Sequence, residues 1–333
     1  MIITRTPFRL SFFGGGTDYN SWFEQHGGLV IAAAMSFYCY ITVRRLPPFF
    51  ENHTSRIVYS KIESVLKHEQ IQHPSVRGCL KYLKVSDGVE IHHDGDLPAR
   101  SGIGSSSSFT VGLLHALHGL GERMVDASRL ATEAIDVEQR LLGESVGIQD
   151  QIMAAHGGLQ VIEMGPSPTW RVRPLLLPFD YQQSLQDHVL LGFSGISRLA
   201  EQHAKAKVDN IKQGKTLNEV REIFELAVEA AKAFSRQADF TEIGKLLDQS
   251  WRVKRQLAGG VSSDWMDDLY STAKKNGAYG GKLMGAGGGG FFFFLAPPHK
   301  HRVIQDALPQ IKVWVPFKID NTGSQVIFYN QQH

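Results

Sequence analysis

A glycine- and serine-rich loop between a predicted strand and a predicted helix constrains this chain more than any other segment. Residues 97–109 read Leu-Pro-Ala-Arg-Ser-Gly-Ile-Gly-Ser-Ser-Ser-Ser-Phe. They follow the alternating segment 89–93, which predicts a strand, and lead into the apolar segment 110–117, which predicts a helix. Gly102 and Gly104 permit positive φ and close approach of a ligand, and a helix N-terminus offers free N–H groups. The segment therefore predicts a phosphate-binding loop rather than a flexible linker.

This loop differs from the two most common nucleotide-binding loops. The pattern G-x-x-x-x-G-K-[ST] needs a lysine after its second glycine, where this chain has Ser105. The dinucleotide pattern G-x-G-x-x-G fails at Ser107. The loop must therefore belong to another class of phosphate-binding site.

The composition is that of an ordinary globular chain. A length of 333 residues predicts about two domains, and a formal net charge of +2 gives no indication of a nucleic-acid or membrane partner. The two cysteines, Cys39 and Cys79, lie in apolar segments and are expected to be buried thiols. No apolar run approaches the ~20 residues that span a bilayer, and residues 1–10 lack the apolar region of a signal peptide. We therefore expect a cytoplasmic protein.

A second glycine-rich turn follows the first predicted strand. Gly14, Gly15 and Gly16 carry no side chains, so a ligand can contact the backbone there. Thr17 and Asp18 follow with a hydroxyl and a carboxylate, which commonly hold sugar hydroxyls. The alternative is a tight turn in which Asp18 caps a short helix.

Two carboxylates lie at positions that suggest chemistry. Glu138 lies four residues after Ala134 and eight after Leu130, so it shares the inward face of a helix predicted over 127–142. A carboxylate there requires either an ion-pair partner or a cation. Asp150 falls in the first turn of a short predicted helix, where the helix dipole favours its charged form, although it could also be a simple helix-start residue.

The second half of the chain contributes two further candidate segments. A turn from Ser194 to Arg198 opens a predicted helix and could bind an anion or act as an ordinary cap. Residues 280–290 form a glycine-rich loop before the apolar strand 291–294. The chain closes with strands near 312–319 and 325–329, which we expect to pair as a hairpin.

The glycine-rich segments resemble signature motifs of the GHMP kinases, a family that includes galactokinase, homoserine kinase, mevalonate kinase and phosphomevalonate kinase. The phosphate loop resembles the pattern P-x-x-x-G-L-G-S-S-A, with Ile103 at the usual leucine. Residues 282–290 resemble the pattern K-x-x-G-A-G-G-G-G almost letter for letter.

The N-terminal segment 6–19 resembles the galactokinase signature P-G-R-x-N-L-I-G-E-H-T-D-Y. Gly15-Gly16 replace the Glu-His pair of that signature, whose glutamate helps galactokinases to bind the sugar. The matching residues are Arg9, Asp18 and Tyr19.

The resemblance implies an α+β fold of two domains, with the active site between them. Residues 1–178 would form an N-terminal domain like ribosomal protein S5 domain 2, carrying the phosphate loop. Residues 179–333 would form a ferredoxin-like C-terminal domain carrying the glycine-rich loop. The resemblance further implies a kinase that uses ATP and Mg²⁺.

The resemblance also assigns roles to individual residues. Asp150 would face the substrate hydroxyl, with Arg9 stabilising either Asp150 or the transferring phosphoryl group, and Glu138 with Ser106 would hold Mg²⁺. The residues expected to bind ATP are Arg100, Gly102, Ile103, Gly104, Ser105, Ser106, Ser107 and Ser108. Those expected to bind the substrate are Gly15, Gly16, Thr17, Asp18, Arg198, Gly287 and Gly288.

Three segments favour one group within the family. The triple glycine before Thr17, the turn 194–198 and the ending 316–323 most resemble kinases that phosphorylate the anomeric hydroxyl of D-glycero-D-manno-heptose 7-phosphate, a step towards nucleotide-activated heptose for surface polysaccharide. The alternatives are another sugar 1-kinase, of the fucokinase or galactokinase type, and a non-catalytic binding protein. Arg198 is the predicted receptor for the phosphate of the substrate, with Arg100 and Lys282 as alternatives.

Overall fold

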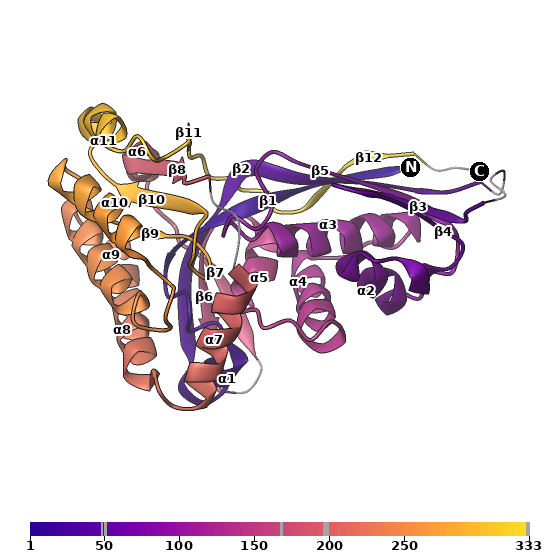
Figure 1. Ribbon diagram of the computed structural model, residues 1–333, viewed down its shortest axis with the longest axis horizontal. Helices are drawn as coiled ribbons and strands as arrows, with labels where there is room; N and C mark the ends of the chain where they lie inside the picture. Colours follow the sequence, from indigo (N-terminus) through magenta and orange to yellow (C-terminus); the bar gives the residue numbers. More distant parts are fainter. Residues whose placement is uncertain (48, 50–51, 167–168, 196–199, 331–333) are drawn as a thin grey trace.

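Two sheets and their covering helices make up the computed structural model, which describes residues 1–47, 49, 52–166, 169–195 and 200–330 (Figure 1). The eight-stranded sheet has the order β12-β1-β2-β5-β3-β4, and β6 extends from β2 to pair with β7. Its strands are β1 (Ile2–Phe13), β2 (Gly28–Arg45), β3 (Ser55–Val58), β4 (Ile62–Val65), β5 (Val89–Gly95), β6 (Leu159–Met164), β7 (Trp170–Pro174) and β12 (Gln325–Tyr329).

The smaller sheet has the order β11-β8-β10-β9, and all its pairs are antiparallel. Its strands are β8 (Val189–Phe193), β9 (Gly280–Leu283), β10 (Phe291–Leu295) and β11 (Val313–Val315).

The helices form two groups, and α8 and α9 of the second group also pack against strands of the large sheet. In Figure 1 the helices α2 to α5 lie along one face of the large sheet, and α8 to α11 gather at the other end of the molecule. The first group is α1 (Asn20–His26), η1 (His68–Gln70), α2 (Pro74–Tyr82), α3 (Ser105–Leu120), α4 (Ala127–Ile135), η2 (Asp136–Leu141) and α5 (Gln149–His156). The second is α6 (Phe179–His188), α7 (Ala200–Lys212), α8 (Leu217–Ser235), α9 (Phe240–Lys254), α10 (Asp264–Lys275), η3 (Pro298–Lys300) and α11 (His301–Ala307).

A single 18-residue strand, β2, contains both apolar runs, 29–34 and 38–43, that lie on either side of residues 35–37. Strand β1 pairs with β2 along most of the length of β1, and this pairing keeps β2 extended as one strand. The register of this pairing shifts after Pro7 and after Ser11, and irregularities of this kind allow long paired strands to bend. One half of β2 then pairs with β6 and the other half with β5.

The predicted C-terminal hairpin is wrong, because its two strands join different sheets. Strand β11 pairs with β8, whereas β12 pairs with β1. The carboxylate of Asp320 accepts hydrogen bonds from the backbone N–H groups of Thr322 and Gly323 and from the Tyr38 hydroxyl. These contacts direct the chain back across β2 rather than onto β11.

Strand β10 joins the two hydrophobic cores, because successive side chains of a strand point to opposite faces. All four of its phenylalanines are buried. Phe291 and Phe293 belong to the large core, where the Phe293 ring makes an edge contact with Phe12 at 5.6 Å. Phe292 and Phe294 belong to the smaller core beneath α10.

Both cysteines are buried free thiols, as the sequence predicts. Within the described ranges, no helix is long and apolar enough to cross a membrane.

Candidate active site

The predicted phosphate loop leads from β5 into the N-terminus of α3. Gly102 and Gly104 have φ of +83° and +77°, which L side chains rarely adopt. The intrahelical bonds begin when Ser108 N–H donates to the Gly104 carbonyl at 2.9 Å. Helix geometry leaves the N–H groups of residues 105–107 without intrahelical acceptors, so they can bind an anion.

The phosphate loop packs directly against the glycine-rich loop after β9. A Cβ at Gly102 would lie 2.6 Å from the Met284 carbonyl oxygen, and a Cβ at Gly285 would lie 2.6 Å from the Gly102 Cα. The N–H of Phe291 donates to the Ser101 carbonyl at 3.1 Å. The two loops therefore meet backbone to backbone, which explains why both positions are glycine.

Arg9 and Asp150 form a two-pronged ion pair beside the phosphate loop. The Arg9 Nε donates to Asp150 Oδ1 at 2.8 Å and its Nη2 donates to Oδ2 at 2.9 Å, while Nη1 donates to the Gly102 carbonyl at 2.6 Å. Arg9 is buried, but a quarter of the Asp150 side chain remains exposed. The structure thus brings together two residues that are far apart in the sequence, with the carboxylate open to a substrate.

Asp18 lies near Asp150, next to the start of α5. Its carboxylate accepts hydrogen bonds from the Gly16 N–H at 2.9 Å and from the Gln149 side chain at 2.8 Å. Burial, opposed by these bonds and reinforced by the charge of Asp150, raises the pKa of Asp18. The N-cap of α1 is Tyr19, so Asp18 does not play the capping role that was its alternative.

The neighbouring substrate candidates have different surroundings. Thr17 is fully buried, and its hydroxyl donates to the Gly14 carbonyl at 2.8 Å, which holds the turn closed. Gly287 and Gly288 lie against Val261, to whose carbonyl the Gly288 N–H donates at 3.4 Å. Arg198 lies outside the described residues.

Glu138 is completely buried within η2, a π-helical turn that continues α4. Its Oε2 accepts hydrogen bonds from Ser107 Oγ at 2.9 Å and from Gln151 Nε2, whereas its Oε1 has no hydrogen-bond partner. Burial raises the pKa of Glu138 to about 7. In the described part of the chain, no cationic side chain forms an ion pair with it.

An unpartnered carboxylate oxygen at the end of the phosphate loop fits a divalent cation better than a structural ion pair. The serine that contacts Glu138 is Ser107, while the predicted Ser106 is exposed one residue nearer to the loop. The assignment of Ser106 to the metal remains a prediction.

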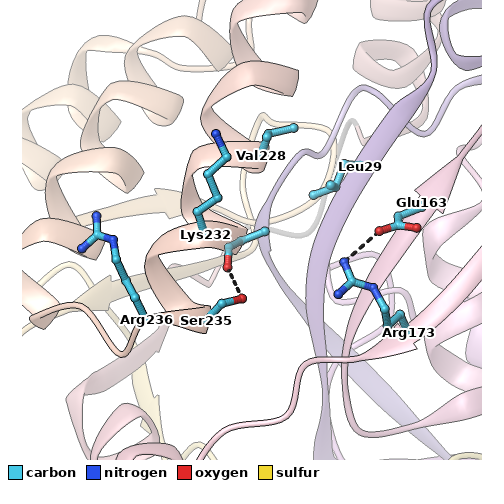
Figure 2. A pocket seen from close by; sticks show the side chains of 8 residues that line it. Leu29, Glu163, Arg173, Val228, Lys232, Ser235 and Arg236 are labelled. Carbon is cyan, nitrogen blue, oxygen red and sulfur yellow. Dashed lines mark hydrogen bonds and ion pairs between the residues drawn. The ribbon is translucent and has the colours of Figure 1, made fainter.

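A separate groove of about 520 Å³ lies between α8 and the strands β6 and β7. Figure 2 shows its lining, in which Arg173 is paired with Glu163 at 2.8 Å. Arg236 is likewise paired with Glu242 on α9. The lining contains none of the candidate residues of the phosphate loop, so this groove is not part of the site.

Comparisons with known proteins agree with this arrangement. Residues 74–158 match the GHMP kinases N terminal domain, and residues 216–311 match the GHMP kinases C terminal domain. The chain is 30% identical over 303 residues to a D-glycero-alpha-D-manno-heptose 7-phosphate kinase from Campylobacter jejuni, with 86% of each protein covered. It is 25% identical to a galactokinase from Pyrococcus furiosus, with 92% of each covered.

A solved structure shares the whole fold. The crystal structure of a D-glycero-D-manno-heptose 1-phosphate kinase from Bacteroides thetaiotaomicron superimposes with a TM-score of 0.80 at 22% identity, covering 99% of this chain and all of that one. The predicted two-domain α+β architecture is therefore confirmed.

Proposed function

Because this chain belongs to the GHMP kinase family of ATP-dependent phosphotransferases, we propose that it phosphorylates the anomeric hydroxyl of D-glycero-D-manno-heptose 7-phosphate. The product would be the 1,7-bisphosphate, an intermediate suited to cytoplasmic synthesis of nucleotide-activated heptose for surface polysaccharide. The chain is a sugar kinase by its relatives, and the choice of sugar is the proposal.

The proposed chemistry rests on the Arg9–Asp150 pair beside the phosphate loop, and the proposed choice of sugar rests on the relative from Campylobacter jejuni. In our scheme Asp150 orients the anomeric hydroxyl and accepts its proton as the oxygen bonds to the γ-phosphorus of ATP, while the bond from that phosphorus to the bridging oxygen breaks and ADP leaves. Arg9 holds the carboxylate in place with two hydrogen bonds, and the loop N–H groups stabilise the phosphate charge. Positioning and charge stabilisation supply most of the rate in phosphoryl transfer.

Glu138 and Ser106 would hold Mg²⁺ in this scheme, and Ser107 and Gln151 would orient the Glu138 carboxylate. The ion would neutralise charge on the ATP phosphates. The fit rests on the unpartnered Oε1 of Glu138, which is free to bind a cation.

Glu138→Gln is expected to raise the Mg²⁺ concentration needed for half-maximal activity and to lower kcat. The amide keeps the shape of the side chain and removes its charge, so a metal loses an anionic ligand. A Mg²⁺ titration of the steady-state rate, with a melting curve of the same variant, provides the measurement. A lower melting temperature with an unchanged titration would instead make Glu138 a purely structural residue.

A substrate panel tests the choice of sugar. The protein is incubated with ATP, Mg²⁺ and each of heptose 7-phosphate, unphosphorylated heptose, fucose and galactose, and ADP release is followed by a coupled assay. Phosphorus NMR identifies the product. The proposal predicts the highest kcat/KM for heptose 7-phosphate and a new anomeric phosphate signal.

Two other results would replace the proposal. A preference for fucose or galactose would favour the alternative sugar 1-kinase, since galactokinases are among the relatives. No ADP release with any sugar would favour a non-catalytic binding protein.

A further inference from the structure

Two buried lysines beside the site have no role in the scheme above. Lys207 lies on α7 and Lys282 on β9, and each exposes only 3% of its surface. Neither ammonium group has a hydrogen-bond acceptor or an ion-pair partner among the residues described. A buried, unpaired cation is costly, so these lysines need an explanation.

A third buried lysine, Lys254, differs from these two because its ammonium group is used in structural hydrogen bonds. Lys254, on α9, donates hydrogen bonds to the carbonyls of Leu283 and Gly285 at 2.9 and 2.8 Å. It thereby supports the glycine-rich loop. Lys207 and Lys282 have no such contacts and remain available to a ligand.

The contacts around these lysines place them beside the turn that contains Asp18. Asn210, one turn after Lys207 on α7, donates to the Leu257 carbonyl at 2.9 Å. A Cβ at Gly16 would lie 3.4 Å from the Leu257 side chain. Three segments therefore meet here: α7, the end of α9 and the turn before α1.

Lys282 approaches the same place from the smaller sheet. It directly precedes Leu283, whose carbonyl binds Lys254 near the end of α9. Figure 1 shows α7 next to α1, and these two helices are in contact. Lys207 and Lys282 repel each other and both are attracted by Asp18, which places the two lysines close to one another and to that carboxylate.

Positive charge exceeds negative charge around Lys207, Lys282 and Asp18. Burial lowers the pKa of Lys282 to about 7, with further repulsion from Arg9, and burial lowers the pKa of Lys207 to about 8. The attraction of Asp18 opposes both shifts. Because Arg9 is already paired with Asp150, one carboxylate, that of Asp18, faces the buried lysines in the described part of the site.

We propose that Lys207 and Lys282 bind the phosphate group that the sugar substrate already carries, at the end remote from the reacting hydroxyl. A phosphate dianion would supply the acceptors and the negative charge that these ammonium groups lack. Asp18, next to them, would accept a hydrogen bond from a sugar hydroxyl. This inference rests on the proposed function, because it assumes that the substrate is a sugar phosphate.

The test compares single variants on a substrate with and without its phosphate. Lys207→Met and Lys282→Met keep an unbranched side chain that is one atom shorter and remove the charge. Lys205→Met is the matched control, because Lys205 lies on the same helix but is exposed. Arg198→Ala examines the receptor predicted from the sequence.

We expect KM for heptose 7-phosphate to rise about 10- to 100-fold in Lys207→Met and in Lys282→Met. KM for ATP and kcat/KM for the unphosphorylated heptose should stay unchanged, and Lys205→Met should behave as the wild type. Melting temperatures should not fall, because methionine replaces an unpaired buried ammonium group. If the lysines had only a structural role, each variant would impair the reaction with heptose 7-phosphate and with unphosphorylated heptose to the same extent.

Three results would overturn the inference. An unchanged KM in both variants, or an effect confined to Arg198→Ala, would remove the lysines and leave the proposed function intact. A rise in KM for ATP with an equal loss on both sugars would place them at the transferring phosphoryl group. A wild-type enzyme indifferent to the phosphate of the sugar would overturn the proposed function itself.

Discussion

Asp150→Asn should fold and bind ATP but lose turnover by ~10²–10⁴-fold, the usual worth of a general base. The substitution keeps the shape of the side chain, while an amide cannot take the proton of the sugar hydroxyl. It also removes one of the two acceptor oxygens that hold Arg9, so the guanidinium is less firmly placed. Steady-state kinetics with the preferred sugar measures the loss.

Two controls separate chemistry from folding in Asp150→Asn. The ATP dissociation constant, measured by calorimetry, should match the wild type, and a melting curve should show a cooperative transition. A kcat near that of the wild type would show that Asp150 is not the base.

Gly104→Val should abolish measurable ATP binding while leaving the fold largely intact. The backbone at this position has a φ of +77°, where a branched residue is strained. A Cβ would also lie 3.2 Å from Arg9 Cγ and 3.3 Å from Asp150 Oδ2, where the side chains already pack closely. Calorimetric titration with ATP measures the effect.

Gly143→Val is the matched control for Gly104→Val. Gly143 has a similar φ of +70°, but a Cβ there meets nothing within 4 Å. It should suffer comparable backbone strain and keep its affinity for ATP. Equal ATP affinity in Gly104→Val and the wild type would remove the loop from the nucleotide site.

The parts of the site that the sequence predicts are those set by local chemistry. A glycine directly before an apolar helix favours a positive φ, so the backbone conformation of Gly104 could be inferred from neighbouring residues. The position of Asp150 at a helix start suggests chemistry by itself, whereas the role of Arg9 follows only from the resemblance to known kinases. The ion pair between them depends on how β1 packs against α5, which no local pattern contains.

The residues that the sequence could not reveal depend on distant packing. Lys207 lies in a polar segment with other lysines, a pattern that normally indicates a solvated helix face. The π-helical turn of η2 inserts an i→i+5 bond from Leu142 N–H to the Val137 carbonyl. That extra residue rotates Leu141 to the surface, although helical spacing predicts it inside.

The extent and the partners of the strands also depend on residues that are distant in the sequence. Residues 35–37 separate two apolar runs and suggest a break, and Ser36 and Phe37 have no partner in β1, but the pairing with β1 resumes on both sides of them and β2 remains one strand. The partners of β11 and β12 likewise lie far away in the sequence.

The pairing of β12 with β1 has a consequence for synthesis on the ribosome. Residues Ile2–Arg5 are synthesised long before residues 325–329, which supply their outer partner strand. Throughout most of translation, β1 therefore presents an open row of backbone N–H and C=O groups. Such an edge can recruit a strand from another nascent chain. A chain that stalls before Gln325 keeps that edge open, so prematurely terminated copies are candidates for aggregation and for capture by chaperones.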